Sequence, residues 1–596
     1  MHRKGGNKMK MKKVSLVMAC LMTMVFVACS NNKSNDEPTK GSEPTKGSEA
    51  TENEVAAEEV SSNSLLAEAG LTDDLRFIEP RTISVGLWNR VEDVEADETY
   101  WADWIAKEIL EAHNIIIKWE PTPRWGEDEF QSTLLSAQSA PDIGYTFNNG
   151  MVTTMAKMGG IHNLYPYLEQ YEELLPNMYA QVGETNIFWN FDTNEQELFS
   201  ISGRRASEGL QNTATFIRED WLEVLGLPVP TSLAEFEATL LAFRDRASEL
   251  PGVAEGTLLA SDIVPYLVTN DVGWDARGVL DSFVPDDVTE REWFVHGFDD
   301  RRFMFEDAMK DGIRVLNRWY TEGLLWKDFV LSEPSDGQDL IRLGAVGAFH
   351  ATWDTPFRSG DGFTTVMREN IGDSATFIPI NPFENDKGNQ RVFASGPVDR
   401  FAFLPSTNDE VVASLLYLDF MSRPETLDLL QFGLEGVHHE VQEDGILKML
   451  PNEDWPIDQK MSGSRNFDIT PLMNGIWFDL VDRDRALATV ALGYPGIEAE
   501  AVLESFNLAV DNAQVFSNVL TRVRNTEEGK QIPLADQRNQ IFHRLIANTL
   551  PENYDEAFDR EYATYMQLGG SAIIEEREQC WIETFGDVDS VPAINE

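Results

Sequence analysis

Residues 82–88, with the sequence Thr-Ile-Ser-Val-Gly-Leu-Trp, begin the part of the chain that decides the fold. Their alternation and their β-branched residues predict a buried strand. Residues 100–112 have helical spacing, and Ile-Ile-Ile-Lys-Trp at 115–119 predicts a second strand. Residues 130–137 are again helical in pattern, and residues 140–145 predict a third strand. Strands that alternate with helices predict an α/β fold with a parallel sheet covered by helices on both faces.

The carboxyl ends of these strands carry candidate ligand-binding residues. Trp88 and Asn89 end the first predicted strand, and Asn148 follows the third. Ligands of open α/β sheets lie beyond the carboxyl ends of the strands, so we expect the three residues near a common rim. For each of them, a place in an ordinary loop remains the alternative.

Helix-end signals continue along the chain. Ser232 and Glu235 have the spacing of a capping box ahead of a helix at 236–246. Residues 305–320 form an amphipathic pattern that Gly323 closes. From about residue 498 onward the pattern is mostly helical. We therefore expect a helical C-terminal extension.

The N-terminal residues have the pattern of an export signal. A basic head is followed by the apolar run 14–28, which is shorter than the roughly 20 residues that a membrane-spanning helix needs. This pattern predicts a secretory signal peptide over residues 1–28. Phe26-Val27-Ala28-Cys29 resembles a bacterial lipobox, which implies that Cys29 is lipidated. An ordinary signal peptide with an incidental cysteine is the alternative.

A polar tether follows the predicted lipidation site. Residues 37–42, Glu-Pro-Thr-Lys-Gly-Ser, repeat at 43–48. The segment from 30 to about 60 has no aromatic residues and few aliphatic ones, so it cannot bury enough surface to fold. We expect residues 29–80 to be a lipidated cysteine and a disordered tether.

The charge of the chain restricts its partners. Its 596 residues contain 101 acidic and 48 basic residues, for a formal net charge of −53. Nucleic acid and anionic lipid would be repelled by such a surface. Any membrane attachment should therefore be covalent. The chain also contains 15 Trp, and an acidic, Trp-rich protein suits a neutral polyol better than an anion.

Residues 217–231, Ile-Arg-Glu-Asp-Trp-Leu-Glu-Val-Leu-Gly-Leu-Pro-Val-Pro-Thr, resemble a segment of bacterial extracellular solute-binding proteins. More specifically, they resemble the large lipoprotein carbohydrate-binding components of ABC importers. Further segments agree with that family in chain order, at 140–143, 160–164, 319–324, 344–349 and 432–438.

The resemblance implies a two-lobed periplasmic-binding-protein fold, similar to type II, with hinge-linked lobes. We expect lobe 1 at 81–200 plus 350–400, and lobe 2 at 201–349 plus 401–596. The implied function is capture of a carbohydrate, in our interpretation an oligosaccharide, by hinge closure and its delivery to the transmembrane subunits of an ABC permease. We expect an extracytoplasmic, lipid-anchored monomer that needs no cofactor and binds no nucleic acid.

Sugar capture requires aromatic faces that stack on the ring and polar groups that bind its hydroxyls. Trp353 is the first candidate, because the family often has a stacking aromatic after this crossing strand, and Asp354 beside it could bind hydroxyls. We expect removal of the Trp353 ring to weaken binding with little loss of stability, although a core or hinge-packing role is the alternative. Further candidates from the loops are Trp189, Trp274 and Trp477.

No catalytic motif supports an enzyme. The chain has no Gly-x-Ser-x-Gly, phosphate-binding loop or His-Glu-x-x-His pattern. The adjacent pair His438-His439 lacks metal-site spacing, so we predict no catalytic residue and no metal site. Two alternatives remain: a peptide- or other solute-binding protein of the same fold, and a secreted polysaccharide-degrading lipoprotein.

Overall fold

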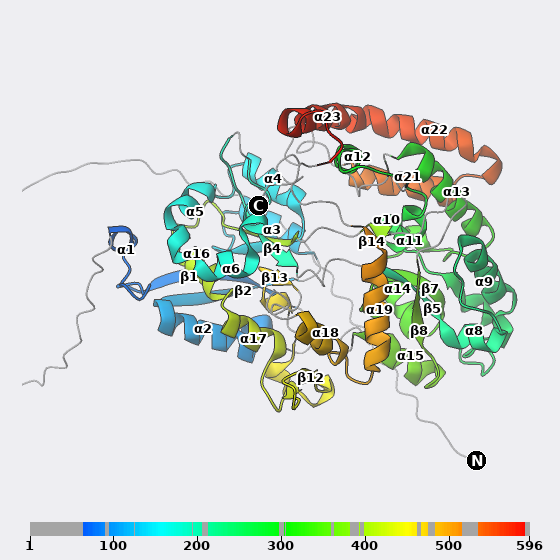
Figure 1. The fold of residues 1–596 in the computed structure, drawn as a ribbon, viewed down its shortest axis with the longest axis horizontal. Coiled ribbons are helices and arrows are strands. Elements are labelled where there is room, and N and C mark those ends of the chain that lie inside the picture. The colour runs from blue at the N-terminus through cyan, green and yellow to red at the C-terminus, as the bar shows by residue number, and fades with distance from the viewer. Residues whose placement is uncertain are drawn as a thin grey trace, which may run out of the picture. The chain divides into compact units, whose positions relative to one another are not determined.

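The computed structural model (Figure 1) describes a body of strands and helices that begins at residue 64. No helix among the described residues has both the length and the apolar composition to cross a membrane. The described residues are 64–590, without 90–93, 124–125, 193–194, 206–212, 286, 297–302, 304, 359–362, 382–391, 394–397, 462–466, 475–482 and 515–533.

The first sheet begins with the strands that the sequence predicts. β1 (Arg81–Asn89) pairs in parallel with β2 (Ile115–Pro123), and a parallel bridge from Val85 to Ile143 links them to a four-stranded sheet. That sheet has the order β13-β4-β10-β3. β10 runs antiparallel to β3 and β4, so β1, β2, β3 and β4 share one direction. The bounds are Met473–Asn474 for β13, Ile201–Arg205 for β4, Val398–Phe403 for β10 and Gly144–Thr146 for β3.

Helices cover this sheet with apolar faces. In α2 (Tyr100–His113), Trp101, Ile105 and Ile109 recur every four residues and are fully buried. α16 (Val411–Phe420) is buried on nearly all sides, which matches its almost continuous apolar sequence. These helices and the first sheet share one hydrophobic core. Other helices of this unit are α3 (Glu127–Ser136), α4 (Asn149–Lys157), α5 (Tyr165–Tyr171), α6 (Pro176–Val182) and α17 (Pro424–Phe432).

The second sheet has the order β6-β7-β5-β8. β5 is antiparallel to β7 and to β8, whereas β6 and β7 are parallel. Its core includes the apolar faces of α8, α9 and α13. The side chain of Ser232 accepts a hydrogen bond from the Glu235 N–H, which confirms the predicted helix start. The strands are β6 (Val264–Tyr266), β7 (Val346–Thr352), β5 (Thr213–Arg218) and β8 (Phe377–Ile380). The helices are α8 (Glu219–Leu225), α9 (Leu233–Asp245) and α13 (Glu306–Thr321).

A buried ion pair closes the corner between β5 and α8. The Arg218 guanidinium donates two hydrogen bonds to Asp220, both 2.7 Å long, and a third to the Gly344 carbonyl at 2.9 Å. It also lies 4.7 Å from the Trp221 ring centroid and 5.7 Å from that of Phe377. The Arg218 side chain is 0% exposed. One side chain therefore ties together β5, α8, the start of β7 and β8.

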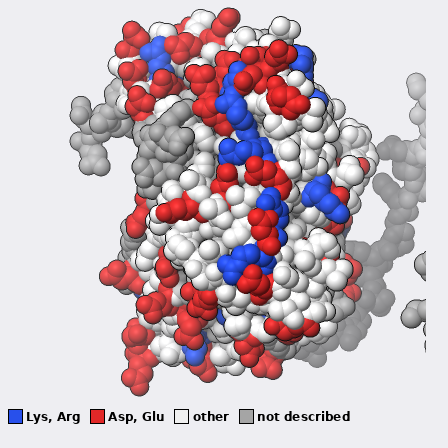
Figure 2. Space-filling model, turned by 90° about the vertical axis from the view of Figure 1, so that its right-hand side faces the viewer, with Lys and Arg blue, Asp and Glu red and all other residues white. Residues whose placement is uncertain are grey.

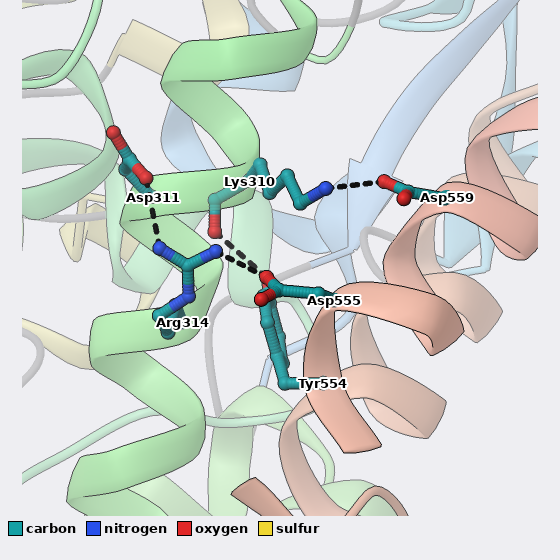
Figure 3. Close-up of polar contacts among 6 residues, drawn as sticks. All are labelled: Lys310, Asp311, Arg314, Tyr554, Asp555 and Asp559. Atoms are coloured by element: carbon teal, nitrogen blue, oxygen red, sulfur yellow. Dashed lines mark hydrogen bonds and ion pairs between the residues drawn. The ribbon is translucent and has the colours of Figure 1, made fainter. Parts of the chain in front are cut away.

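The last described segments are mostly helical, as predicted. α21 (Ala535–Ala547) and α22 (Tyr554–Tyr565) pack on α13, and α23 (Ser571–Phe585) packs on α12 (Glu290–His296). Figure 3 shows how Lys310 and Arg314 of α13 pair with Asp559 and Asp555 of α22. The Tyr554 hydroxyl donates to the Lys310 carbonyl at 2.9 Å.

The basic side chains on the face turned toward the viewer in Figure 2 form a line with acidic side chains beside them. Separately, Lys310, Arg314, Arg318 and Arg544 each form an ion pair with a carboxylate. These pairs are partly exposed, so each contributes little to stability.

The residues that form each sheet differ from the residues that we expected in each lobe. The expectation assigned 350–400 to the first lobe, but β7 and β8 pair with β5 in the second sheet. It assigned 401–596 to the second lobe, but residues 401–403 pair with β3 and β4. Long-range antiparallel pairing leaves no local mark in the sequence, which is why the pattern of strands and helices did not reveal it.

The expected tether, 29–80, includes residues 64–80, which the structure shows to be folded. α1 (Ser64–Ala69) begins at residue 64, and Leu71 bridges Phe77. Leu66, Leu71 and Phe77 are buried in the core of the first sheet. Apolar residues at these positions explain why this segment packs.

We predict that Asp220→Ala lowers the free energy of unfolding by about 3–5 kcal/mol, because it leaves the Arg218 guanidinium buried without its carboxylate. Urea denaturation measures the change. The matched control is Glu249→Ala, which removes the partner of the exposed Arg246 and should change stability by less than about 1 kcal/mol. Equal effects of the two substitutions would contradict this role for the buried pair.

Candidate ligand-binding site

The carboxyl ends of β1, β3 and β4 lie at one edge of the first sheet, together with the amino end of β10. We call Trp88, Phe147, Arg205 and Arg400 the first rim, because they stand at these strand ends. This is the edge where open α/β sheets bind ligands.

Trp88 and Arg400 form the packed part of the first rim. The rings of Trp88 and Phe147 are stacked, with centroids 5.2 Å apart and planes at 16°. The Arg400 guanidinium lies 5.1 Å from the Trp88 centroid and 5.4 Å from that of Phe147. It donates to the Thr470 carbonyl at 3.3 Å and lies 3.8 Å from Asp468. Trp88 is only 7% exposed, so its ring fixes the guanidinium at the rim.

The next strand after β4 in the chain, β5, belongs to the second sheet. β4 ends at Arg205 and β5 begins at Thr213, so the two residues are at most roughly 29 Å apart. Thr213 pairs with Thr352, the last residue of β7. We call Thr352, Asp354 and Arg358, which follow from that strand end, the second rim.

Asp354 is held by an arginine. Its carboxylate accepts hydrogen bonds from Arg358 at 2.9 and 2.6 Å and from the Tyr494 hydroxyl at 3.0 Å. Arg358 also donates to the Thr352 hydroxyl at 2.8 Å. Burial alone would raise the pKa of Asp354, but the Arg358 charge and these hydrogen bonds hold it below its usual value. Asp354 is therefore an ionised anchor for the guanidinium.

Trp353 packs inward. Its ring meets Phe506 and Tyr494 edge to face, at centroid distances of 5.2 and 6.1 Å. The Ser505 hydroxyl donates to the Trp353 carbonyl at 2.6 Å. The residue is 9% exposed and belongs to the core of the first sheet. This burial favours the alternative of a packing role for the ring, while its contact with a ligand remains a prediction.

The pKa of Arg205 is lowered to about 9, mainly by burial and also by the positive charges of Arg400 and Arg358, whereas Asp354 acts in the opposite direction. Three guanidinium groups from β4, β10 and the segment after β7 thus lie within electrostatic reach of one another.

Asn148 lines a cavity of about 800 Å³ beside the first rim, between α3, α4 and residues 405–407. Its side chain caps α4 by accepting from the Met151 N–H at 3.1 Å and donates to Asp128 at 2.8 Å. Asp128 also accepts from the Thr146 hydroxyl. Met155 and Leu135 contribute apolar surface to the cavity wall. The structure therefore places Asn148 at a hollowed polar edge of the sheet.

The other predicted site residues are more dispersed. Asn89 donates to Glu95 at 2.5 Å. Trp189 is buried in a small apolar cluster with Phe401 and Phe403. Trp274 lies at the second sheet, 4.7 Å from the Arg277 guanidinium. Trp477 and Cys29 lie outside the described residues.

Arg205, Arg358 and Arg400 are not among the residues predicted from the sequence. The net charge of −53 argued against an anion-binding site, and the three residues are far apart in the chain. Arg204-Arg205 is a local basic pair at the end of a strand, which is the one signal that sequence offered. Among the described residues, no group of three or more His, Cys, Asp or Glu side chains could hold a metal ion.

Two α/β sheets whose rims are joined by a crossing chain define the two-lobed fold of ABC solute-binding proteins. Solved structures with this fold include alginate-binding protein AlgQ2 without calcium ion, which has a TM-score of 0.59 at 16% identity over 84% of this chain and 98% of that one. The *S. pneumoniae* ABC-transporter substrate-binding protein FusA, an EF-hand mutant in complex with fructo-nystose, has the same TM-score of 0.59 at 14% identity over 84% of this chain and 99% of that one.

Curated relatives agree with the resemblance seen in the sequence. The chain is 22% identical over 492 residues to the polygalacturonan/rhamnogalacturonan-binding protein YtcQ of *Bacillus subtilis* (strain 168), covering 80% of this chain and 88% of that protein. It is also 22% identical over 371 residues to lipoprotein LipO of the same organism, covering 61% and 69%. No family model matches the chain. These relatives and structures include carbohydrate-binding proteins, so the predicted resemblance is confirmed.

We predict that Trp353→Ala lowers the free energy of unfolding of the ligand-free protein by about 3–5 kcal/mol, because it leaves a cavity against Phe506 and Tyr494. Urea denaturation measures this loss. Trp274→Ala, at a half-buried ring, is the control and should cost less. Unchanged stability together with lost sugar binding would instead support the original prediction for Trp353.

Proposed function

We propose that this chain is the substrate-binding protein of an ABC importer and captures an oligosaccharide between its two lobes. The observation that carries the proposal is the pair of α/β sheets, each with its own hydrophobic core, linked by segments of chain that run from one sheet to the other. Closure of the lobes would bring polar and aromatic groups around the ligand. The function is capture and delivery to the permease, and no bond is made or broken.

The relatives support a carbohydrate as the ligand. YtcQ is named as a polygalacturonan/rhamnogalacturonan-binding protein, and the FusA structure is a complex with fructo-nystose. We propose that residues near the rims border the ligand, including Trp88, Asn148, Trp353 and Asp354, and that Trp274 borders it from the second sheet. In this proposal Trp88 and Trp353 support the site by packing.

We further propose the arrangement of the chain. The first sheet and its core form lobe 1, the second sheet and its core form lobe 2, and residues 29–63 are the tether. LipO, a lipoprotein, supports an extracytoplasmic position with a lipid anchor at Cys29. The protein would act as a monomer beside the permease subunits.

Cys29→Ser should move the protein from the membrane fraction to the soluble one, and continued membrane association would contradict the anchor.

A thermal-shift screen of the mature, delipidated protein tests the function. A ligand at 100 times its dissociation constant stabilises the folded state by about 2.7 kcal/mol, so the melting temperature should rise with one family of oligosaccharides. Peptides are the control ligands, and the recovered glycan is checked for cleavage. A shift with peptides alone would favour a peptide-binding protein, and a cleaved glycan would favour an enzyme.

A further inference from the structure

The cavity of about 800 Å³ between α3 and α4 is large enough to hold a ligand of its own. The two helices contact each other and lie beside the first sheet (Figure 1). Residues 405–407, which follow β10, form its third wall. Sites that bind small molecules have volumes of roughly 300–1,000 Å³. Among the residues that line this cavity, only Asn148 is one that the sequence predicts to bind a ligand.

One carboxylate joins the cavity to the edge of the first sheet. Asp128 accepts a hydrogen bond from the Thr146 hydroxyl at 2.5 Å and another from the Asn148 side chain at 2.8 Å. Thr146 is the last residue of β3, and the Asn148 side chain in turn accepts from the Met151 N–H at the start of α4. The network thus connects the strand end to both helices. The cavity therefore begins at the edge where we place the oligosaccharide.

The cavity walls combine polar groups with apolar surface. Serine, threonine, asparagine and glutamine side chains supply hydroxyl and amide groups to the lining. Met151, Met155 and Pro405 are buried and supply apolar surface. A sugar unit needs both kinds of partner, because its hydroxyls require hydrogen bonds on burial and its C–H faces are stabilised by apolar contact. The composition of the walls therefore suits a carbohydrate.

The charge of the walls favours uncharged sugar units. Of the 18 lining residues, only Asp128 and Glu129 are charged, and both are acidic. They would repel the carboxylate of an acidic sugar. A sugar hydroxyl can instead donate to a carboxylate and form a charge-assisted hydrogen bond. Each carboxylate oxygen can accept more than one hydrogen bond, so Asp128 can bind a hydroxyl and keep its contacts with Thr146 and Asn148.

We propose that this cavity is a second sugar-binding subsite, which takes uncharged units of an oligosaccharide whose other units lie at the rims. The inference rests on the proposed function, because it adds a subsite to the same site. Only an oligosaccharide long enough to reach past Asp128 and Asn148 gains the additional contacts. Selection for length would then be a property of the first sheet and its helices.

Methionine oxidation reports on occupancy of the cavity. Met158 lines the cavity and is 73% exposed, so peroxide converts it readily to the sulfoxide. The probes are neutral gluco-, galacto-, manno- and fructo-oligosaccharides of two to six units, and galacturonic acid oligomers are the acidic comparison. In a series that raises the melting temperature, the longer neutral members should slow Met158 oxidation at least about threefold, because a bound sugar shields the thioether. Met566, between α22 and α23, is the internal control and should oxidise at an unchanged rate.

Ser132→Trp tests the same subsite by filling it. Ser132 is an exposed residue of α3 that lines the cavity, so an indole there occupies part of the volume. Calorimetry should show about tenfold weaker binding of the longer oligosaccharides and little change for the shorter ones, because the lost contacts include charge-assisted hydrogen bonds. Thr133→Trp is the matched control: it is the next residue of α3, is exposed and does not line the cavity, so it should bind as the wild type does. Both positions are exposed, so both variants should keep the melting temperature of the ligand-free protein.

The outcomes separate this inference from the proposed function. If a neutral oligosaccharide raises the melting temperature, but Met158 oxidation and the affinity of Ser132→Trp stay unchanged, the subsite is wrong and the proposed function stands. If only galacturonic acid oligomers protect Met158, the assignment to uncharged units is wrong. If no sugar raises the melting temperature, both the subsite and the proposed function fail.

Discussion

The buried Arg218–Asp220 pair is the constraint on which the second half of the site depends. Its guanidinium binds the Gly344 carbonyl just before β7 and lies beside Trp221 and Phe377. Bringing this charge out of water is unfavourable unless every partner is in place, so the pair strongly disfavours other registers of β5 against β7 and β8. The register in turn sets where β7 ends, and therefore where Thr352, Asp354 and Arg358 stand.

In the first sheet, too, aromatic rings hold a buried guanidinium in place. Trp88 and Phe147 hold Arg400 at the strand ends, as Trp221 and Phe377 hold Arg218 in the second sheet. In both places a guanidinium lies beside aromatic faces and is oriented by a carbonyl. Both guanidinium groups are buried, with side-chain exposures of 0% for Arg218 and 2% for Arg400. The same local chemistry thus orients a buried guanidinium in each sheet.

Local structure could be predicted from the sequence, but pairing between distant segments could not. Alternation and capping patterns gave β1, α2, β2 and α9, because these signals lie within a few residues. The antiparallel places of β5 and β10 depend on partners more than a hundred residues away, so the lobe boundaries differed. The site shows the same limit. Trp353 has the sequence position of a ligand-contacting residue, but Phe506 and Tyr494, more than a hundred residues later, pack against its ring.

The central claim is that the two lobes close on an oligosaccharide without cleaving it. Small-angle X-ray scattering of the delipidated protein, with and without a saturating oligosaccharide, tests this directly when the recovered sugar is also analysed. The account predicts a smaller radius of gyration with the sugar, and recovery of that sugar intact. An unchanged radius of gyration at saturation, or a shortened sugar, would contradict it.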